Sequence, residues 1–92
     1  MNPVRPPLWF YTYVLMSQKD GNFYTGVTNN LKKRFEEHNS GSVFSTKHRV
    51  PLKLIYFEAC LAKNDAYRRE RYLKTGMGKR FLRNRLKGGL TG

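Results

Sequence analysis

Residues 8–38 read LWFYTYVLMSQKDGNFYTGVTNNLKKRFEEH, and this stretch decides the fold of the chain. Residues 8–16 are apolar or aromatic on both alternations, which is typical of a central strand that is covered on both faces. Asp20-Gly21-Asn22 is a turn signal, and residues 23–27 form a second run of strand-forming side chains. The two runs therefore predict a β-hairpin.

The register of this hairpin decides where its tyrosines point. If Leu15 pairs with Tyr24, Tyr13 pairs with Gly26, and both tyrosines project from the same face of the sheet. A shift of one residue would separate them. Gly26 would leave space at the strand end where another backbone or a phosphate could approach. Taken singly, each tyrosine could equally be an ordinary strand residue.

The rest of the chain predicts one more strand and three helices. These are a helix over residues 31–38 capped by Asn29 or Asn30, a strand over 52–62, a helix from Asn64 or Asp65 to about Lys74, and a basic helix over 79–87. The order β-β-α-β-α-α predicts an α+β fold with a small three-stranded antiparallel sheet flanked by helices. We expect a single domain over residues 1–92, with a core at about 8–75 and a frayed tail at 88–92.

Charge is the strongest feature of the composition. Eighteen Lys and Arg residues against six Asp and Glu give a net charge of +12. Such a surplus in 92 residues favours a polyanionic partner, and nucleic acid is the expected one. A membrane partner is disfavoured, because the basic helices lack a bulky apolar face and the apolar run at 8–16 is too short to cross a bilayer. The single cysteine, Cys60, excludes a disulfide within the chain and suggests the reducing cytoplasm.

Two helices are expected to carry a charged or polar side chain on the apolar face. In the first, Leu31, Arg34, Phe35 and His38 recur at i, i+3, i+4 and i+7 and therefore share that face. Arg34 could serve a site there or simply extend its charge to the rim of the face.

In the second helix, Ala66, Glu70 and Leu73 are spaced i, i+4, i+7, which makes Glu70 the acid on or beside the apolar face. An ion pair with Lys74 at i+4 would explain Glu70 without any function. Glu58, in the third strand, is expected to neutralise a nearby Arg or Lys.

The motif order of the chain resembles that of the GIY-YIG endonucleases, over roughly residues 10–74. The first motif reads Tyr11-Thr12-Tyr13 and keeps only its tyrosine, and the second reads Tyr24-Thr25-Gly26, a close match. Arg34, His38 and Glu70 stand where the family has its arginine, its histidine or tyrosine, and its metal-binding glutamate. The chain departs from the family at Val27, where a lysine is often found. The stretch from Asp20 to Asn29 looks especially like the short single-domain bacterial members of the family.

The resemblance implies a metal-dependent endonuclease that acts on DNA rather than RNA, including structured or branched DNA. Tyr13 and Tyr24 would flank the attacking water, and one of them would act as base through His38 or through a pKa lowered by a nearby cation. Arg34 would hold the scissile phosphate, and Glu70 would hold a single Mg²⁺ or Mn²⁺. The motif positions expected to support this site are Gly26, Thr28 and Asn29.

Two other functions remain open from the sequence. One is a noncatalytic DNA- or RNA-binding module on the same scaffold, and the other is a small adaptor whose aromatic sheet face binds protein. For either the enzyme or the binding module, the expected phosphate track consists of Lys79, Arg80, Arg83 and Lys87. No small-molecule cofactor is expected.

Overall fold

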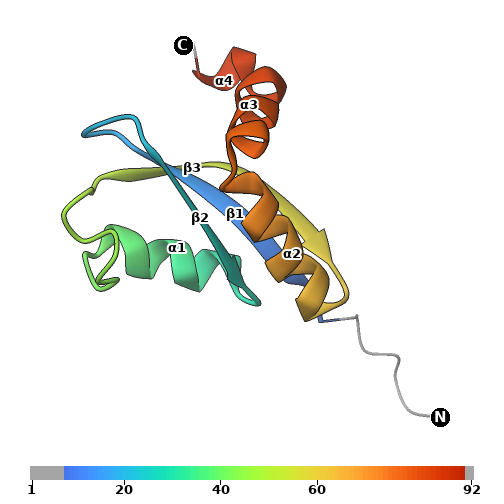
Figure 1. Ribbon diagram of the computed structural model, residues 1–92. Helices are drawn as coiled ribbons and strands as arrows, with labels where there is room; N and C mark the ends of the chain where they lie inside the picture. The colour runs from blue at the N-terminus through green and yellow to red at the C-terminus, as the bar shows by residue number, and fades with distance from the viewer. Residues whose placement is uncertain (1–7, 91–92) are drawn as a thin grey trace.

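The computed structural model describes residues 8–90, and residues 1–7, 91 and 92 lie outside the described part of the chain. Its elements follow the order β-β-α-β-α-α-α, which confirms the predicted α+β class (Figure 1). They are β1 (Phe10–Ser17), β2 (Phe23–Thr28), α1 (Leu31–Asn39), β3 (Leu52–Cys60), α2 (Lys63–Leu73), α3 (Gly76–Arg85) and α4 (Lys87–Leu90).

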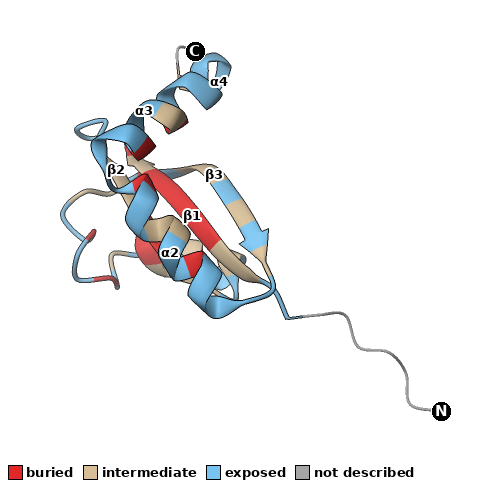
Figure 2. Ribbon diagram, turned by 45° about the vertical axis from the view of Figure 1, so that its right-hand side comes forward, coloured by how far each residue is buried: buried red, intermediate tan, exposed pale blue. Residues whose placement is uncertain are grey.

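The sheet is antiparallel with strand order β2-β1-β3, so β1 is the central strand, as its unbroken apolar run predicts. Thr12, Tyr13, Val14 and Leu15 are all buried, and Figure 2 shows this strand as the buried centre of the molecule. The hairpin register is the expected one, with Leu15 opposite Tyr24 and Tyr13 opposite Gly26.

Alternation along β1 divides the core into two clusters, one on each face of the sheet. Tyr13 and Leu15 pack with Leu52 and with the apolar side chains of α1. Val14, on the other face, packs with Leu73 of α2 and Leu82 of α3. The sheet therefore separates α1 from α2 and α3.

A β-bulge interrupts the alternation of side chains between the two faces along β3. Leu54 lies opposite Leu15, but Tyr56 lies opposite Val14, so Ile55 is an extra residue. The bulge shifts the side-chain phase by one residue. Leu54 consequently packs in the α1 cluster, whereas Ile55 and Tyr56 pack in the α2–α3 cluster.

An ion pair fastens α2 to β3, as expected for Glu58. The Nε of Arg69 donates to both carboxylate oxygens of Glu58, at 3.1 and 2.8 Å, and the Tyr56 hydroxyl donates to the same carboxylate at 3.0 Å. The Arg69 guanidinium also lies 5.1 Å from the ring centre of Tyr72 and 4.9 Å from that of Phe81. One side chain thus connects β3, α2 and α3.

The helix boundaries in the C-terminal third differ from the expected ones. The second helix begins at Lys63, before the expected caps Asn64 and Asp65. The third begins earlier than predicted because Thr75 caps it, with its hydroxyl accepting from the backbone N–H of Gly78 at 3.1 Å.

The expected single helix over 79–87 is also wrong, because α3 ends at Arg85 and Leu86 lies outside the helical region with φ −111° and ψ 22°. Of the expected frayed tail at 88–92, residues 88–90 belong to the short helix α4, since the N–H groups of Gly89 and Leu90 both donate to the carbonyl of Leu86 at 3.0 Å, and the last two residues lie outside the described part of the chain. Within residues 8–90, no helix has the length and apolar content that crossing a membrane requires.

Two glycines in the first turn of α3 provide a test of the α2–α3 packing. A Cβ on Gly78 would collide with the backbone of Tyr72 and Leu73, whereas a Cβ on Gly76 would meet nothing within 4 Å. We expect Gly78→Ala to lower the free energy of unfolding by about 1–3 kcal/mol or more. Gly76→Ala should leave it unchanged or raise it slightly. Urea denaturation followed by circular dichroism distinguishes the two, and equal stability of both variants would contradict this packing.

Candidate active site

A chain of three buried polar side chains forms the centre of the site. The Tyr13 hydroxyl is 2.8 Å from Nε2 of His38, and Nδ1 of His38 is 2.7 Å from the Thr46 hydroxyl. The side chains come from β1, from the end of α1 and from the loop that precedes β3. Both His38 and Thr46 have an exposed fraction of 0%. Each ring nitrogen of His38 therefore has one partner and no access to water.

Burial determines the protonation of this chain. Desolvation, together with the positive charge of Arg34, lowers the pKa of His38 from its ordinary 6.5 to about 4, so the imidazole is neutral at pH 7. Burial also raises the pKa of the Tyr13 phenol above its ordinary value of 10.0, although a hydrogen bond from Arg34 offsets part of this rise. The expectation of a lowered pKa is therefore wrong for Tyr13, which is a neutral phenol bonded to a neutral imidazole.

Gly26 makes room for the Tyr13 phenol. A Cβ at this position would lie 2.5 Å from the Tyr13 hydroxyl oxygen and 2.7 Å from the ring carbon that bears it. The space that the glycine leaves is thus filled by the tyrosine of the neighbouring strand, and the expectation of a phosphate or second backbone there is wrong. Tyr24 lies beside this group, with its ring centre 5.0 Å from that of His38 and 6.4 Å from that of Tyr13.

Arg34 brings a positive charge to the same phenol. Its hydrogen bond to Tyr13 raises the pKa of the guanidinium, and its Nη1 also lies 3.4 Å from a Glu37 carboxylate oxygen. The side chain remains 36% exposed. Arg34 can therefore contact Tyr13 and a molecule in solvent at the same time. An arginine whose only role is to place its charge in water at the rim of the apolar face would not need the contact with Tyr13.

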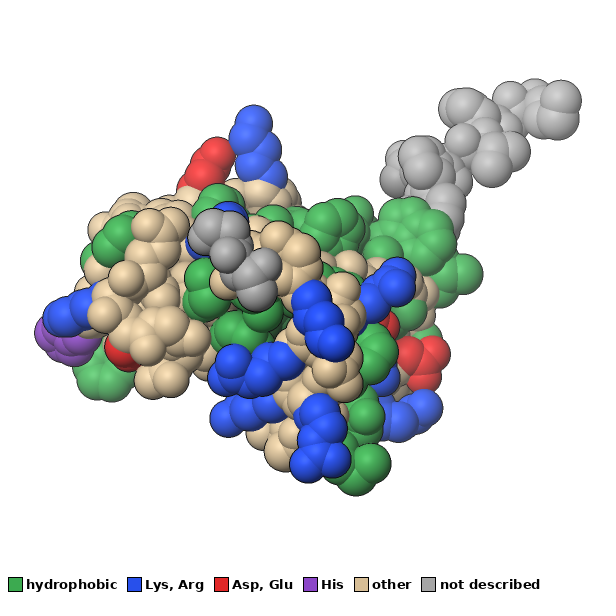
Figure 3. Space-filling view, turned by 90° about the horizontal axis from the view of Figure 1, so that it is seen from above, with side chains coloured by type: hydrophobic (Ala, Val, Ile, Leu, Met, Phe, Trp, Pro, Cys, Tyr) green, Lys and Arg blue, Asp and Glu red, His purple; other side chains and the backbone are tan. Residues whose placement is uncertain are grey.

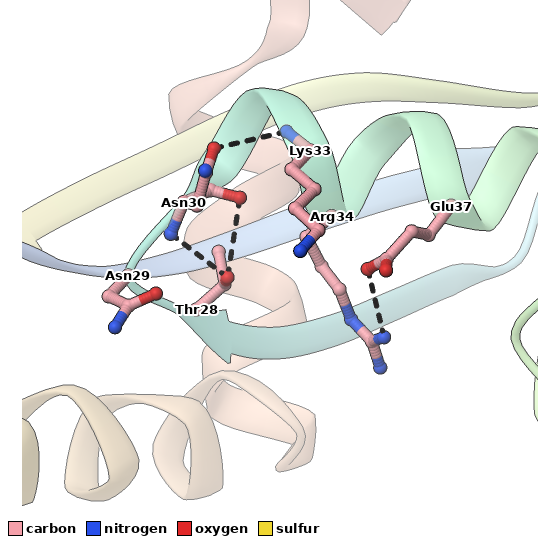
Figure 4. Close-up of a pocket in the computed structure, with 6 residues that line it drawn as sticks. All are labelled: Thr28, Asn29, Asn30, Lys33, Arg34 and Glu37. Atoms are coloured by element: carbon pink, nitrogen blue, oxygen red, sulfur yellow. Dashed lines mark hydrogen bonds and ion pairs between the residues drawn. The ribbon is translucent and has the colours of Figure 1, made fainter.

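A polar pocket of about 230 Å³ opens beside Arg34, between the end of β2 and the first two turns of α1 (Figure 4). It is lined by Thr28, Asn29, Asn30, Lys33, Arg34 and Glu37. Asn30 caps α1 as predicted, with its side-chain oxygen accepting from the backbone N–H of Lys33 at 3.2 Å. The Thr28 hydroxyl accepts from the backbone N–H of Asn30 at 3.1 Å, so it shapes the turn.

Glu70 approaches from the other layer of helices. Its helix packs on the face of the sheet opposite Tyr13 and Tyr24, because the flanking Ala66 and Leu73 are buried there. The carboxylate is nevertheless close enough for its charge to raise the pKa of Tyr13. The Glu70 side chain is 18% exposed, and a carboxylate oxygen lies 3.4 Å from Nζ of Lys74. The ion pair with Lys74, which would explain Glu70 without any function, is therefore present. The other four predicted residues cluster on the α1 face of the sheet, whereas Glu70 belongs to a helix on the other face.

The donor set limits what metal could bind. No group of three or more His, Cys, Asp or Glu side chains within residues 8–90 is arranged to hold a metal ion. A single carboxylate such as Glu70 fits Mg²⁺ or Mn²⁺ that takes its other ligands from water and phosphate. It does not fit a zinc site, which would need three or four protein ligands.

The predicted phosphate track is divided between two helices. Lys79, Arg80 and Arg83 are exposed on α3, but Lys87 is exposed on α4, beyond the break at Leu86. Figure 3 looks onto this end of the molecule and shows several Lys and Arg side chains gathered there. The Arg83 guanidinium lies 5.1 Å from the ring centre of Phe23, so it also packs against the sheet.

Three residues of the site region were not singled out from the sequence: Thr46, Lys33 and Glu37. Thr46 lies in a polar loop with no periodic pattern, and nothing in its neighbours signals burial against His38. Lys33 stands on the polar side of the helical wheel, and only the position of the β2–α1 turn makes it line the pocket.

Comparison with known proteins identifies similar sequences and a similar fold. The sequence model of the GIY-YIG catalytic domain family matches residues 9–84. The UPF0213 protein CPE1444 of Clostridium perfringens is 48% identical over 65 residues, which cover 70% of this chain and 69% of that protein. A UPF0213 protein of Limosilactobacillus reuteri is 46% identical over 68 residues, covering 71% and 70%. The solution structure of the UPF0213 protein BH0048 from Bacillus halodurans is 36% identical, covers 88% of this chain and 87% of that one, and has a TM-score of 0.53.

The protonation of His38 predicts how stability depends on pH. The folded pKa of about 4 lies below the ordinary 6.5, so between these values the unfolded chain binds a proton that the folded chain does not. The stabilisation is complete above about pH 6.5 and is lost as the pH falls toward 4, by about 3 kcal/mol in all. Urea unfolding at pH 7 and pH 4.5 should show this loss.

Two variants test whether the imidazole of His38 causes this loss of stability at low pH. His38→Gln should remove most of the loss between pH 7 and 4.5, whatever its stability at pH 7. His48→Gln is the matched control because His48 is the other histidine and is exposed. It should retain the loss caused by His38, and equal pH dependence of the two variants would argue against a buried neutral His38.

Proposed function

The chain belongs to the GIY-YIG catalytic-domain family, and from this premise we propose that it is a metal-dependent endonuclease that hydrolyses phosphodiester bonds in DNA. Membership of the family implies nuclease-type chemistry in general, and the proposal adds the substrate and the roles of the residues. The observation that carries it is the buried hydrogen bond between Tyr13 and His38 beside the Arg34 guanidinium. These groups combine a route for a proton with a cation for a phosphate.

In this proposal Tyr13 receives the proton of the attacking water. Its own proton passes at the same time to Nε2 of His38, 2.8 Å away, so the phenol never becomes a free phenolate. This requires the histidine tautomer whose Nδ1–H donates to the Thr46 hydroxyl. The low pKa of His38 keeps Nε2 unprotonated at neutral pH and therefore able to accept. Tyr24 borders the water from the neighbouring strand.

Arg34 would bind the scissile phosphate. The guanidinium presents several donors in one plane, which suits two phosphate oxygens, and its partly exposed side chain leaves donors free for them. The contact with Tyr13 would set the distance between the phosphate and the attacking water. Arg34 would thus stabilise the charge that develops on the phosphate oxygens.

Glu70 would hold the single Mg²⁺ or Mn²⁺, after exchanging its ion pair with Lys74 for the metal. When bound, the metal would take up negative charge from the phosphate and the leaving oxygen. With one protein carboxylate as ligand, we expect weak metal binding until the substrate adds its phosphate oxygens.

A second candidate function is a noncatalytic module for binding DNA or RNA. The observation in its favour is the set of exposed cations on α3 and α4, which could contact phosphates without any reaction. Both candidate functions involve nucleic acid as the partner. They differ in whether Arg34 and Glu70 take part in cleavage of the phosphodiester bond.

Substitution of Glu70 and Arg34 tests the enzyme. We expect Glu70→Gln and Arg34→Ala each to lower the cleavage rate by at least about a hundredfold, the scale of losing one electrostatic stabiliser. The melting temperature should change little, because Arg34 is 36% exposed and Glu70→Gln keeps the shape of a side chain that is 18% exposed. Rates should be measured on single-stranded, duplex, flapped and branched DNA and on RNA, with Mg²⁺ and with Mn²⁺. Glu36→Gln, an exposed acid of α1, is the matched control and should cleave like the wild type.

Binding without metal separates the two candidate functions. Glu70→Gln should bind nucleic acid at least as well as the wild type, since it removes an acid from a basic surface. If the wild type cuts none of these substrates with either metal, or if Glu70→Gln cuts as fast as the wild type, the binding module becomes the better account.

The exposed cations of α3 predict the salt dependence of binding. We expect the double variant Lys79→Gln/Arg80→Gln to lower the slope of log affinity against log salt by about one to two units, equally for all sequences. Fluorescence anisotropy with a labelled oligonucleotide at several salt concentrations measures this slope. Unchanged affinity for every nucleic acid would mean that these side chains are only a solvated face.

A further inference from the structure

The pocket between β2 and α1 contains more positive charge than a clamp for one phosphate requires. Lys33 and Arg34 line it together, against the single carboxylate of Glu37. Figure 4 shows the side chains of Lys33 and Arg34 extending from α1 in the same general direction. Arg34 belongs both to this pocket and to the group around Tyr13. The pocket is therefore adjacent to the place proposed for the scissile phosphate.

Two of the lining side chains are free to bind a ligand. Within the described residues 8–90, the Lys33 ammonium and the Asn29 amide have no hydrogen-bond or ion-pair partner, and both residues are exposed. By contrast, the side-chain oxygen of Asn30 accepts from the N–H of Lys33, and the Glu37 carboxylate pairs with Arg34. Lys33 and Asn29 are therefore the side chains on which the inference rests.

We propose that this pocket binds a second phosphate of the same nucleic-acid strand, adjacent to the scissile one, with Lys33 as its cation and Asn29 as a neutral donor. The inference rests on the proposed function, because it takes the position of the scissile phosphate from Arg34. Successive phosphates of one strand are the only anions that a nucleic acid presents at a regular short spacing. Lys33 is the next residue to Arg34 on α1 and lines the same pocket, so it can contact the phosphate beside the one that Arg34 binds.

The charge of the pocket selects a phosphate over other ligands. Two cations against one carboxylate leave a net positive charge, and the carboxylate is directed to Arg34, 3.4 Å away. A base would find no aromatic side chain here on which to stack, since all six lining residues are polar or charged. Lys33 would act as a point charge and Asn29 as a hydrogen-bond donor, and neither reads the sequence.

Lys32 and Lys33 form a matched pair for the test. They are adjacent on α1, carry the same charge and are both exposed, but only Lys33 lines the pocket. Binding of a labelled dodecanucleotide is measured in EDTA, so the result does not depend on catalysis. We expect Lys33→Gln to weaken binding about two- to fivefold, the scale of one exposed ionic contact, and to lower the salt slope by roughly 0.7 to 0.9. Lys32→Gln should change both quantities less.

A neutral phosphate identifies the contact. Oligonucleotides carrying one methylphosphonate, moved stepwise along the strand, lose a single negative charge at a known place. In cleavage assays, Lys33→Gln should cleave more slowly than the wild type on the unmodified strand. This difference in rate should disappear when the methylphosphonate replaces the phosphate next to the cleaved one, on one side only. It should persist when the methylphosphonate is at any other position. Lys32→Gln should show no such position. Asn29→Ala should reproduce the positional pattern with a smaller loss.

The outcomes separate this inference from the proposed function. If the wild type cleaves nothing while Lys33→Gln binds more weakly than Lys32→Gln, the enzyme is wrong and the phosphate pocket stands. If the wild type cleaves but Lys33→Gln and Lys32→Gln bind alike, and no methylphosphonate position removes the effect of Lys33→Gln, the pocket is wrong and the enzyme stands.

Discussion

The hydrogen bond between Tyr13 and His38 is the constraint on which the candidate site depends. A phenol and an imidazole can be buried together only if each polar atom has a partner, and Thr46 provides the partner for the second ring nitrogen. The bond connects the central strand to the end of α1, and through Thr46 to the loop before β3. Gly26 is required by the same contact, because any side chain there would push the phenol away from His38. A single pair of atoms thus ties together two strands, a helix and a loop.

The two layers of helices bring opposite charges near the Tyr13 phenol. The helix α1 supplies Arg34 on the face that carries the tyrosines, and α2 supplies Glu70 from the opposite face. The charges of both side chains shift the pKa of Tyr13, Arg34 lowering it and Glu70 raising it. The Arg69–Glu58 ion pair holds α2 against β3 and so contributes to the position of the adjacent Glu70. The side chains of Arg34 and Glu70 are thus partly exposed, whereas the Tyr13–His38 pair, the proposed proton route, is buried.

This separation of buried and exposed groups has a chemical consequence. The low dielectric around His38 and Tyr13 keeps both neutral, so the proposed proton route would operate at neutral pH without a preformed phenolate. Arg34, Lys33 and Glu70 remain in contact with water, where the proposed substrate could replace Glu37 as the partner of Arg34, and the proposed metal could replace Lys74 as the partner of Glu70. A strongly basic surface would attract nucleic acid over a distance, and the fixed geometry of Arg34 beside Tyr13 would then select one phosphate.

Local patterns in the sequence determined the element order, the central position of β1, the hairpin register and the cap at Asn30, because each depends on residues close together in the chain. Tertiary structure decided where the bulge at Ile55 falls, the short helix at the C-terminus, and the direction of the pKa shift at Tyr13. The same is true of the partnership of Thr46 with His38 and the approach of Glu70 from the opposite face. These features arise from burial and from contacts between residues far apart in the chain. A side chain's desolvation and its distant partners have no signature in the spacing of neighbouring residues.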